Sequence, residues 1–310
     1  MNYDVIIVGG GAAGCNAALI LGRCRRNVLI VDAQLPRNQS SDALHGFLSR
    51  DGQPPKDVMQ QAWRDLVRYE TVHRENNFAT NVSRSDGGFL VEFAGGRKVT
   101  GQKLLLATGA VDRLPKLPRF QEFYGKTVHT CPYCDAWEHR DKPMVVYGYE
   151  ARAVSLAQML QRWSDDITLC CDGRSELSAR DRDALKESGI DLIEKEVATL
   201  SGSGGRLVGV VFSDGTRVDC VTMFTALGIE CRSKLFDQLG CVRDAAGALR
   251  IDPVTEETSV RGVYAAGDAS RDILLVVVAA AEGAKAAIAI DHALARDHGK
   301  RKHAPLAAVS

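Results

Sequence analysis

The sequence predicts an α/β chain that contains two folds of the Rossmann type, each a parallel sheet covered by helices. Three observations indicate this. An apolar run at residues 5–8 leads through a glycine-rich turn into a helical pattern that ends at Leu21. A second apolar run at residues 144–147 also ends in a glycine. The length of 310 residues is enough for two domains that each bury their own core.

The composition is that of a globular protein, with 45% hydrophobic and 25% charged residues. Lysine and arginine together number 39, as do aspartate and glutamate, so there is no global basic field and no nucleic-acid partner is expected. The apolar stretch at residues 273–281 is too short to span a bilayer. The first residues enter a strand pattern without the basic segment of a signal peptide. We therefore expect a cytoplasmic protein with no membrane partner.

The first glycine-rich turn has the pattern G-x-G-x-x-G, formed by Gly9, Gly11 and Gly14. Gly9 allows the tight turn, Gly11 lets a pyrophosphate approach the backbone, and Gly14 lets helix and strand pack closely. The start of the following helix offers unpaired N–H groups to phosphates. The next apolar run, Val28–Val31, ends in Asp32, which is placed to accept hydrogen bonds from ribose hydroxyls. This unit therefore predicts a dinucleotide site.

A Cys-Pro-Tyr-Cys motif places Cys131 and Cys134 close enough to form a disulfide. The nine cysteines are an odd number and are scattered along the chain, which argues against a structural disulfide framework. A zinc site would need a second pair of ligands at metal spacing, and none follows, so no metal is expected. The adjacent Cys170 and Cys171 are more typical of a strand. The close pair is therefore the candidate redox couple.

Two further predicted strands end in polar motifs. Residues 104–109 end in Thr108-Gly109, and residues 262–268 end in Gly267-Asp268. With the glycine turn, the cysteine pair and the second fold, these motifs follow one another in the order seen in one family. The chain resembles the low-molecular-weight thioredoxin reductases, which are class II pyridine nucleotide-disulfide oxidoreductases.

The resemblance covers nearly the whole chain and implies a domain organisation. The FAD-binding domain is split into residues 1–114 and 243–310, and an NAD(P)-binding-like domain that carries the dithiol, residues 115–242, is inserted between its halves. The resemblance also implies a homodimer that pairs through the FAD domains. Its partner is implied to be a thioredoxin-like protein or a small-molecule dithiol or disulfide.

The same resemblance implies roles for individual residues. Cys134 lies next to the flavin, Cys131 attacks the substrate disulfide, and Asp135 gives and takes the proton of the leaving thiol. Asp268 reaches the ribityl chain of FAD, and a helix over 278–290 points its start toward the flavin. Thr108, Gly109 and Gly267 belong to the same cofactor site. His139 is interpreted as a surface polar residue rather than a proton relay.

The second glycine signature departs from the family pattern. Gly148 and the small Ala153 are present, but Glu150 stands where the middle glycine belongs. Its carboxylate adds bulk and negative charge where a pyrophosphate would approach. Asp172 stands at the second strand end, where the family carries arginines for the 2′-phosphate of NADPH, and an acid there favours a free 2′-hydroxyl. Use of NADPH is therefore in doubt.

These features predict an FAD-dependent thiol–disulfide oxidoreductase that moves two electrons between FAD and the Cys131–Cys134 pair. Three sources or sinks of electrons stay open at this point. In the first, NADH is the donor and binds weakly through Asp172. In the second, another donor, such as a second flavin or a protein, reduces the FAD. In the third, external dithiols reduce FAD and oxygen reoxidises it, as in a dithiol oxidase.

Overall fold

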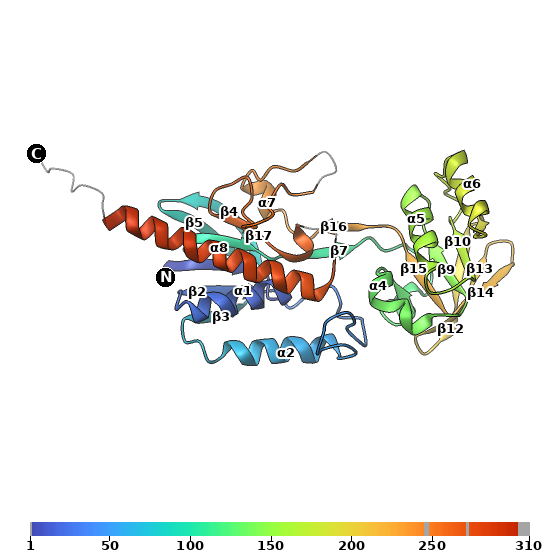
Figure 1. Cartoon of the computed structure of the whole chain (residues 1–310), viewed down its shortest axis with the longest axis horizontal. Helices are drawn as coiled ribbons and strands as arrows, with labels where there is room; N and C mark the ends of the chain where they lie inside the picture. The colour runs from blue at the N-terminus through green and yellow to red at the C-terminus, as the bar shows by residue number, and fades with distance from the viewer. Residues whose placement is uncertain (1, 245–247, 271–272, 303–310) are drawn as a thin grey trace, which may run out of the picture. The chain divides into compact units, whose positions relative to one another are not determined.

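The computed structural model describes residues 2–244, 248–270 and 273–302, and the chain divides into two compact units (Figure 1). Unit 1 comprises Met1–Pro36, Lys56–Ala110 and Cys231–Ser310, and unit 2 comprises Arg37–Pro55 and Val111–Glu230. The chain crosses between them after Pro36, Pro55, Ala110 and Glu230, whereas the sequence placed two boundaries, after residues 114 and 242. The segment 37–55 was expected in the first domain, but it groups with unit 2.

Unit 1 contains a seven-stranded sheet in the order β3-β2-β1-β6-β5-β4, with β17 paired to β6. Strands β1, β2, β3, β6 and β17 run parallel, whereas β4 and β5 form an antiparallel extension on β6. The predicted apolar runs are confirmed as its central strands. The strand bounds are β1 (Asn2–Val8), β2 (Val28–Asp32), β3 (Val72–Asn76), β4 (Ala79–Ser85), β5 (Gly88–Phe93), β6 (Lys98–Leu106) and β17 (Val263–Ala265).

Alternate residues of β1 face opposite sides of this sheet, as the two-residue period of a strand requires. Val5 and Ile7 lie in the core cluster that includes residues of helices α1 and α8, and Ile6 and Val8 lie in the other cluster. Helix α8 runs beside α1 along the sheet (Figure 1). The helices of unit 1 are α1 (Ala12–Arg23), α2 (Pro55–Leu66), α7 (Leu235–Gln238) and α8 (Val276–Lys302), with a short 3-10 helix η2 (Gly267–Ala269).

Helices α1 and α8 approach closely because a glycine stands at their contact. A Cβ on Gly283 would lie 2.1 Å from the carbonyl oxygen of Ala13, so only glycine fits there. The side-chain amide of Asn16 donates a hydrogen bond to the carbonyl of Ala280 at 2.6 Å. The helix predicted over 278–290 is therefore confirmed, although it is longer and begins at Val276.

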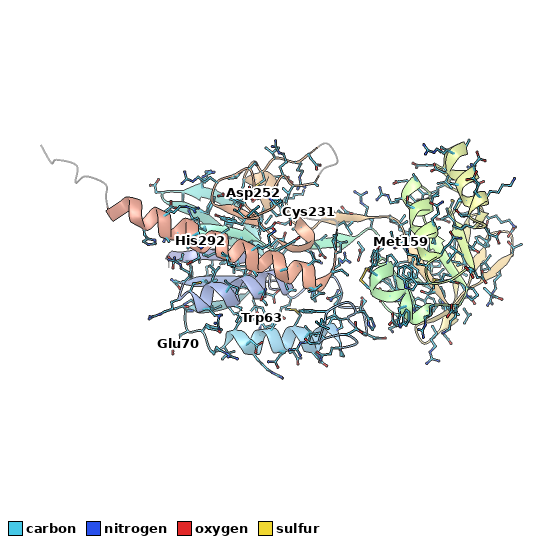
Figure 2. All side chains as sticks on the ribbon, viewed as in Figure 1. Trp63, Glu70, Met159, Cys231, Asp252 and His292 are labelled. Carbon is cyan, nitrogen blue, oxygen red and sulfur yellow. A yellow bond between two sulfur atoms is a disulfide. The ribbon has the colours of Figure 1, made fainter. Side chains whose placement is uncertain are left out.

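Helix α2 covers the same core with an amphipathic face that includes Met59, Ala62 and Trp63. Figure 2 labels Trp63 on this helix, and the guanidinium of Arg74 lies 3.7 Å from its ring centroid. Such stacking suits arginine, because its flat cation is weakly hydrated.

Unit 2 contains a five-stranded parallel sheet in the order β11-β10-β9-β15-β8 and a three-stranded antiparallel sheet, β12-β13-β14. This confirms the second Rossmann-like fold. The strand bounds are β8 (Val128–His129), β9 (Met144–Tyr147), β10 (Ile167–Cys170), β11 (Asp191–Ile193), β12 (Val197–Ser203), β13 (Arg206–Phe212), β14 (Arg217–Asp219) and β15 (Thr222–Thr225). Strands β7 (Ala110–Asp112) and β16 (Ile229–Cys231) pair with each other where the chain crosses after Ala110 and after Glu230.

Different elements pack against the two faces of the parallel sheet of unit 2. Met144 and Val146 of β9 lie in a cluster with residues of helix α5, while Val145 and Tyr147 lie in a cluster with residues of β12 and β13. Tyr147 therefore faces the antiparallel sheet. The helices of unit 2 are α3 (Phe120–Phe123), α4 (Pro132–Asp135), α5 (Ala151–Leu160) and α6 (Ala179–Glu187), with a 3-10 helix η1 (Trp137–His139).

A search of the described residues finds no helix long and apolar enough to cross a membrane. In the same part of the chain, no group of three or more His, Cys, Asp or Glu side chains is arranged to hold a metal ion.

Candidate active site and cofactor site

Cys131 and Cys134 form a disulfide, with their Cα atoms 5.3 Å apart. The pair spans the one-turn helix α4, in which Cys131 is the N-cap and Pro132 is the first helical residue. Proline suits that position because its φ is already helical and its missing N–H would have no helical partner. Since α4 has a single turn, its dipole can do little to stabilise a thiolate.

A carboxylate and two imidazoles lie in a row beside this disulfide. Oδ1 of Asp135 lies 3.3 Å from Nδ1 of His129, and Nε2 of His129 lies 3.3 Å from Nε2 of His139. His129 is only 6% exposed and lies on β8, where it pairs with Phe224 of β15. The structure thus gives Asp135 a close imidazole partner that the sequence reasoning missed.

His139 is half-buried, so its interpretation as a surface polar residue is wrong. Burial, together with the neighbouring His129, lowers the pKa of His139 to about 4. The imidazole is therefore neutral near pH 7. A contact between two Nε2 atoms needs one donor and one acceptor, so the two rings can share a proton without a second charge.

Two aromatic side chains stand exposed beside the disulfide. Tyr133, inside the motif, is 58% exposed, and Trp137 is 61% exposed. The guanidinium of Arg140 lies 4.2 Å from the Trp137 ring centroid. Exposed large rings next to a reactive pair offer contact area to a partner.

In unit 1, the glycine turn is shaped as the sequence predicts. A Cβ on Gly9 would lie 2.0 Å from the carbonyl oxygen of Ala107, and one on Gly14 would lie 1.9 Å from that of Gly9. By contrast, a Cβ on Gly11 would meet nothing within 4 Å. Two glycines are thus required by packing, and the third faces the open space that a pyrophosphate needs.

The other predicted cofactor residues of unit 1 gather around this turn. A Cβ on Gly9 would lie 3.2 Å from the backbone nitrogen of Thr108, and one on Gly267 would lie 3.2 Å from Ala13. The hydroxyl of Thr108 is buried and, in the described structure, has no hydrogen-bond partner. A buried hydroxyl without a partner is costly, which points to a ligand that supplies one. These residues therefore fit a bound dinucleotide.

Left-handed turns hold the two polar motifs in place. Gly109 has φ of 66° and Gly267 has φ of 77°, a region that favours glycine. The N–H of Gly267 donates to Oε2 of the buried Glu282 on α8 at 2.7 Å. Asp268 follows in η2. Glu282 was missed from the sequence, although a carboxylate among the apolar and alanine residues that begin this helix was a signal for it.

Asp32 ends β2 beside the turn. Its Oδ1 accepts the N–H of Gln34 at 2.9 Å, and its Oδ2 lies 3.5 Å from Arg74. A Cβ on Gly10 would lie 2.4 Å from Cγ of Asp32, so this glycine makes room for the carboxylate.

Comparison with known proteins identifies this arrangement. The family model for pyridine nucleotide-disulphide oxidoreductases matches residues 3–283. The chain belongs to this family. Its members are FAD-dependent disulfide oxidoreductases that also use a pyridine nucleotide, and the resemblance to thioredoxin reductases is confirmed.

Several relatives of this oxidoreductase carry matching names. A protein of Arthroderma benhamiae named "Probable thioredoxin reductase" is 32% identical, over 87% of this chain and 74% of its own length. Thioredoxin reductase aclD of Aspergillus oryzae is 29% identical, over 95% of this chain and 97% of its own. Among solved structures, HlmI is 35% identical with a TM-score of 0.93, covering 97% of this chain and 95% of its own. An oxidoreductase of Agrobacterium tumefaciens is 33% identical with a TM-score of 0.87, covering 96% and 99%.

The second glycine signature of this oxidoreductase keeps the close packing of strand and helix, but it has a charged side chain where unit 1 has an open glycine. A Cβ on Gly148 would lie 2.9 Å from Cβ of Ala153, so the tight contact between strand and helix is retained. Glu150 is the N-cap of α5, and its carboxylate pairs with Arg152 at 2.7 Å. A carboxylate and its own counter-ion thus stand at the start of α5, where a phosphate would bind.

Asp172 is turned away from the position that the sequence assigned to it. It is buried, and its backbone has φ of 52°. Its Oδ2 accepts the hydroxyl of Tyr147 at 2.5 Å, and its Oδ1 accepts the N–H of Val197 at 2.8 Å. The expectation that Asp172 accepts a ribose hydroxyl stays a prediction that this geometry does not favour, because the side chain is buried and held by two donors from the core.

Proposed function

We propose that this enzyme exchanges two electrons between its Cys131–Cys134 pair and an external dithiol or disulfide. The observation that carries the proposal is the disulfide itself, with Asp135 lying 3.3 Å from His129, and His129 in hydrogen-bonding contact with His139. The family match supports FAD as the cofactor.

In the oxidative direction, a thiolate of an external dithiol attacks Cys131, and Cys134 leaves as a thiolate. The second substrate thiolate then attacks the mixed disulfide, closes the substrate disulfide and releases Cys131. The substrate loses two electrons and two protons, and the enzyme pair gains the two electrons. In the reductive direction, Cys131 attacks an external disulfide by the same path in reverse.

The three polar side chains manage the protons of this exchange. Asp135 orients His129 through Nδ1, which leaves Nε2 to exchange a proton with His139. His139 is neutral near pH 7, but with a pKa of about 4 it is a weak base, so its Nε2 takes part by relaying a proton to or from His129 rather than by holding one. General acid–base help of this kind contributes about 10²–10⁴-fold to a rate.

Unit 1 would hold the cofactor. Gly9, Gly11 and Gly14 would receive the pyrophosphate, and Asp32 the adenosine ribose. Thr108, Gly109, Gly267 and Asp268 would line the rest of the site. When bound, FAD supplies a two-electron carrier that returns the cysteine pair to its starting oxidation state.

A second candidate function, a dithiol oxidase that passes electrons to oxygen, is favoured by unit 2. The Glu150–Arg152 pair and the buried Asp172 both oppose nicotinamide binding there. The competing routes are a reductase driven by NADH or NADPH, as the family match favours, and a reductase fed by a second flavin or a protein.

The substrate partner proposed is a thioredoxin-like protein or a small-molecule dithiol or disulfide. The names of the relatives and the exposed Tyr133 and Trp137 support a docking partner at the dithiol. A homodimer is proposed from the family resemblance, and light scattering after gel filtration tests it. A cytoplasmic location is supported by seven free cysteines, which are typical of a reducing compartment.

An anaerobic titration tests the function. The yellow protein is mixed separately with NADH, NADPH and dithiothreitol while the oxidised-flavin absorbance is followed. Bleaching by dithiothreitol is expected, and its absence would refute the proposal. Additional rapid bleaching by NADH or NADPH would identify a nicotinamide-driven reductase, and bleaching by the dithiol alone would support the oxidase.

A further inference from the structure

Tyr147, the last residue of β9, holds the carboxylate that a Rossmann fold normally offers to the nucleotide. We infer that Tyr147 determines nucleotide specificity in unit 2 by keeping Asp172 inside the protein. The inference rests on the proposed function, because it concerns the electron donor of the same enzyme.

Three features fix the position of the Asp172 side chain: two hydrogen-bond donors and the conformation of its own backbone. The Tyr147 hydroxyl donates to Oδ2 at 2.5 Å from β9, and the Val197 N–H donates to Oδ1 at 2.8 Å from the start of β12. The positive φ of Asp172, 52°, is unusual for a residue other than glycine. This backbone conformation belongs to the turn that brings the side chain to its two donors.

Both donors belong to the face of the sheet that is covered by β12 and β13. Tyr147 is 2% exposed and Val197 is 5% exposed, and both lie in the core cluster on that face. Asp172 itself is only 9% exposed. The carboxylate is therefore satisfied by the core, and it is not available at the carboxyl edge of the sheet, where a ribose would lie.

Removing the tyrosine hydroxyl leaves one carboxylate oxygen without a donor in a buried place, which is costly. Released from the tyrosine, the carboxylate can turn toward the carboxyl edge of the sheet, where a ribose 2′-hydroxyl replaces the lost donor and a 2′-phosphate is repelled. Tyr147→Phe is therefore expected to raise the affinity for NAD⁺ by about tenfold, the size of a hydrogen bond to a charged group, and to give no gain in affinity for NADP⁺.

The experiment is a calorimetric titration of the full-length, FAD-loaded protein with NAD⁺ and NADP⁺, neither of which reduces the flavin. Tyr124→Phe is the matched control, because Tyr124 donates a hydrogen bond of the same 2.5 Å to Asp112 elsewhere in unit 2. The double variant Tyr147→Phe/Asp172→Asn is expected to lose the gain. An NAD⁺ affinity of Tyr147→Phe within twofold of the parent, or an equal gain for NADP⁺, overturns the inference.

Asp172→Asn in the parent gives an independent test if Tyr147→Phe does not fold. A locked carboxylate does not contact the nucleotide, so the NAD⁺ affinity should change by less than about twofold, and a tenfold loss would show that Asp172 already binds ribose. The calorimetry does not depend on the cysteine pair. A failure of dithiol bleaching would therefore count against the proposed function alone.

Discussion

The two Rossmann-like units share a strand, a tight glycine turn and a helix, yet they treat the space beyond the turn differently. In unit 1, a Cβ on Gly11 would meet nothing within 4 Å, and the Thr108 hydroxyl nearby is buried without a partner in the described structure. In unit 2, Glu150 and Arg152 pair at the same place, and Asp172 is satisfied by Tyr147 and Val197.

The difference shows that the fold alone does not make a nucleotide site. Both glycines that permit close packing in unit 1 have counterparts in Gly148 and Ala153 of unit 2. In unit 2 the paired side chains of Glu150 and Arg152 stand in place of an open glycine, and the buried Asp172 is held by donors from the core. Its chemistry lies instead at the Cys131–Cys134 pair, which has no counterpart at a comparable position in unit 1 among the described residues.

The largest expected effect separates the roles of the two units. Cys134→Ser is expected to lower disulfide turnover by at least about 10³-fold, because no disulfide can form, while unit 1 keeps its flavin. Turnover is measured with an external disulfide, and bound flavin by absorbance. Cys24→Ser, at an exposed free cysteine of unit 1, is the control. Unchanged turnover in Cys134→Ser would contradict the assignment of the dithiol.

Two glycines of unit 1 should differ from each other. Gly14→Ala places a methyl group 1.9 Å from the Gly9 carbonyl oxygen, so a loss of stability of about 3 kcal/mol is expected. Gly11→Ala should keep the melting temperature but weaken FAD binding by about tenfold, since its methyl group enters the space for the pyrophosphate. Denaturant unfolding and flavin retention are the measurements. Equal effects of the two variants on stability would contradict this reading of Gly11.

The neutral His139 predicts a pH dependence of stability in unit 2. Its pKa is lowered to about 4 in the folded protein, so the unfolded chain binds more protons between pH 6.5 and pH 4. The stabilising contribution is complete above pH 6.5, is lost as the pH falls, and stops changing below pH 4. After allowance for solvent screening, about 1–2 kcal/mol is expected.

Denaturant unfolding at pH 7 and pH 5 compares the parent with His139→Gln. The loss of stability on acidification should be smaller in the variant. His292→Gln, at an exposed histidine of α8 (Figure 2), should behave as the parent does. An identical acid loss in His139→Gln and the parent would show that this imidazole is not kept neutral by the fold.

The smallest effect tests whether unit 2 can be returned toward the pattern of unit 1. Glu150→Gly restores G-x-G-x-x-A and frees Arg152 from its ion pair. A gain of about two- to fivefold in affinity for NADH and NADPH is expected, the size of one charge removed from a helix start. Anaerobic flavin bleaching at increasing nucleotide concentrations measures it. Arg182→Gln, which breaks an exposed pair with Glu194, should give no gain.

The sequence by itself determined the two Rossmann-like folds, their central apolar strands and the position of the dithiol. These depend on local signals: apolar runs, glycines at turn positions and two cysteines three residues apart. The roles of the glycines of unit 1 could be predicted from the sequence, because each position of the motif requires a missing Cβ for one known reason. The effect of Glu150 could be predicted for the same reason, since a large side chain stands at a position where the motif has a glycine.

Only the tertiary structure decided which polar groups are available. Asp172 has the sequence position of a ribose-binding acid, but two donors from other strands hold it in the core. His129 and Glu282 acquire partners that lie 6 and 15 residues away in the chain, too far for a local pattern to show. The range of a hydrogen bond is about 3 Å in space whatever the separation in sequence. The availability of a side chain to a ligand is therefore a property of the packed fold.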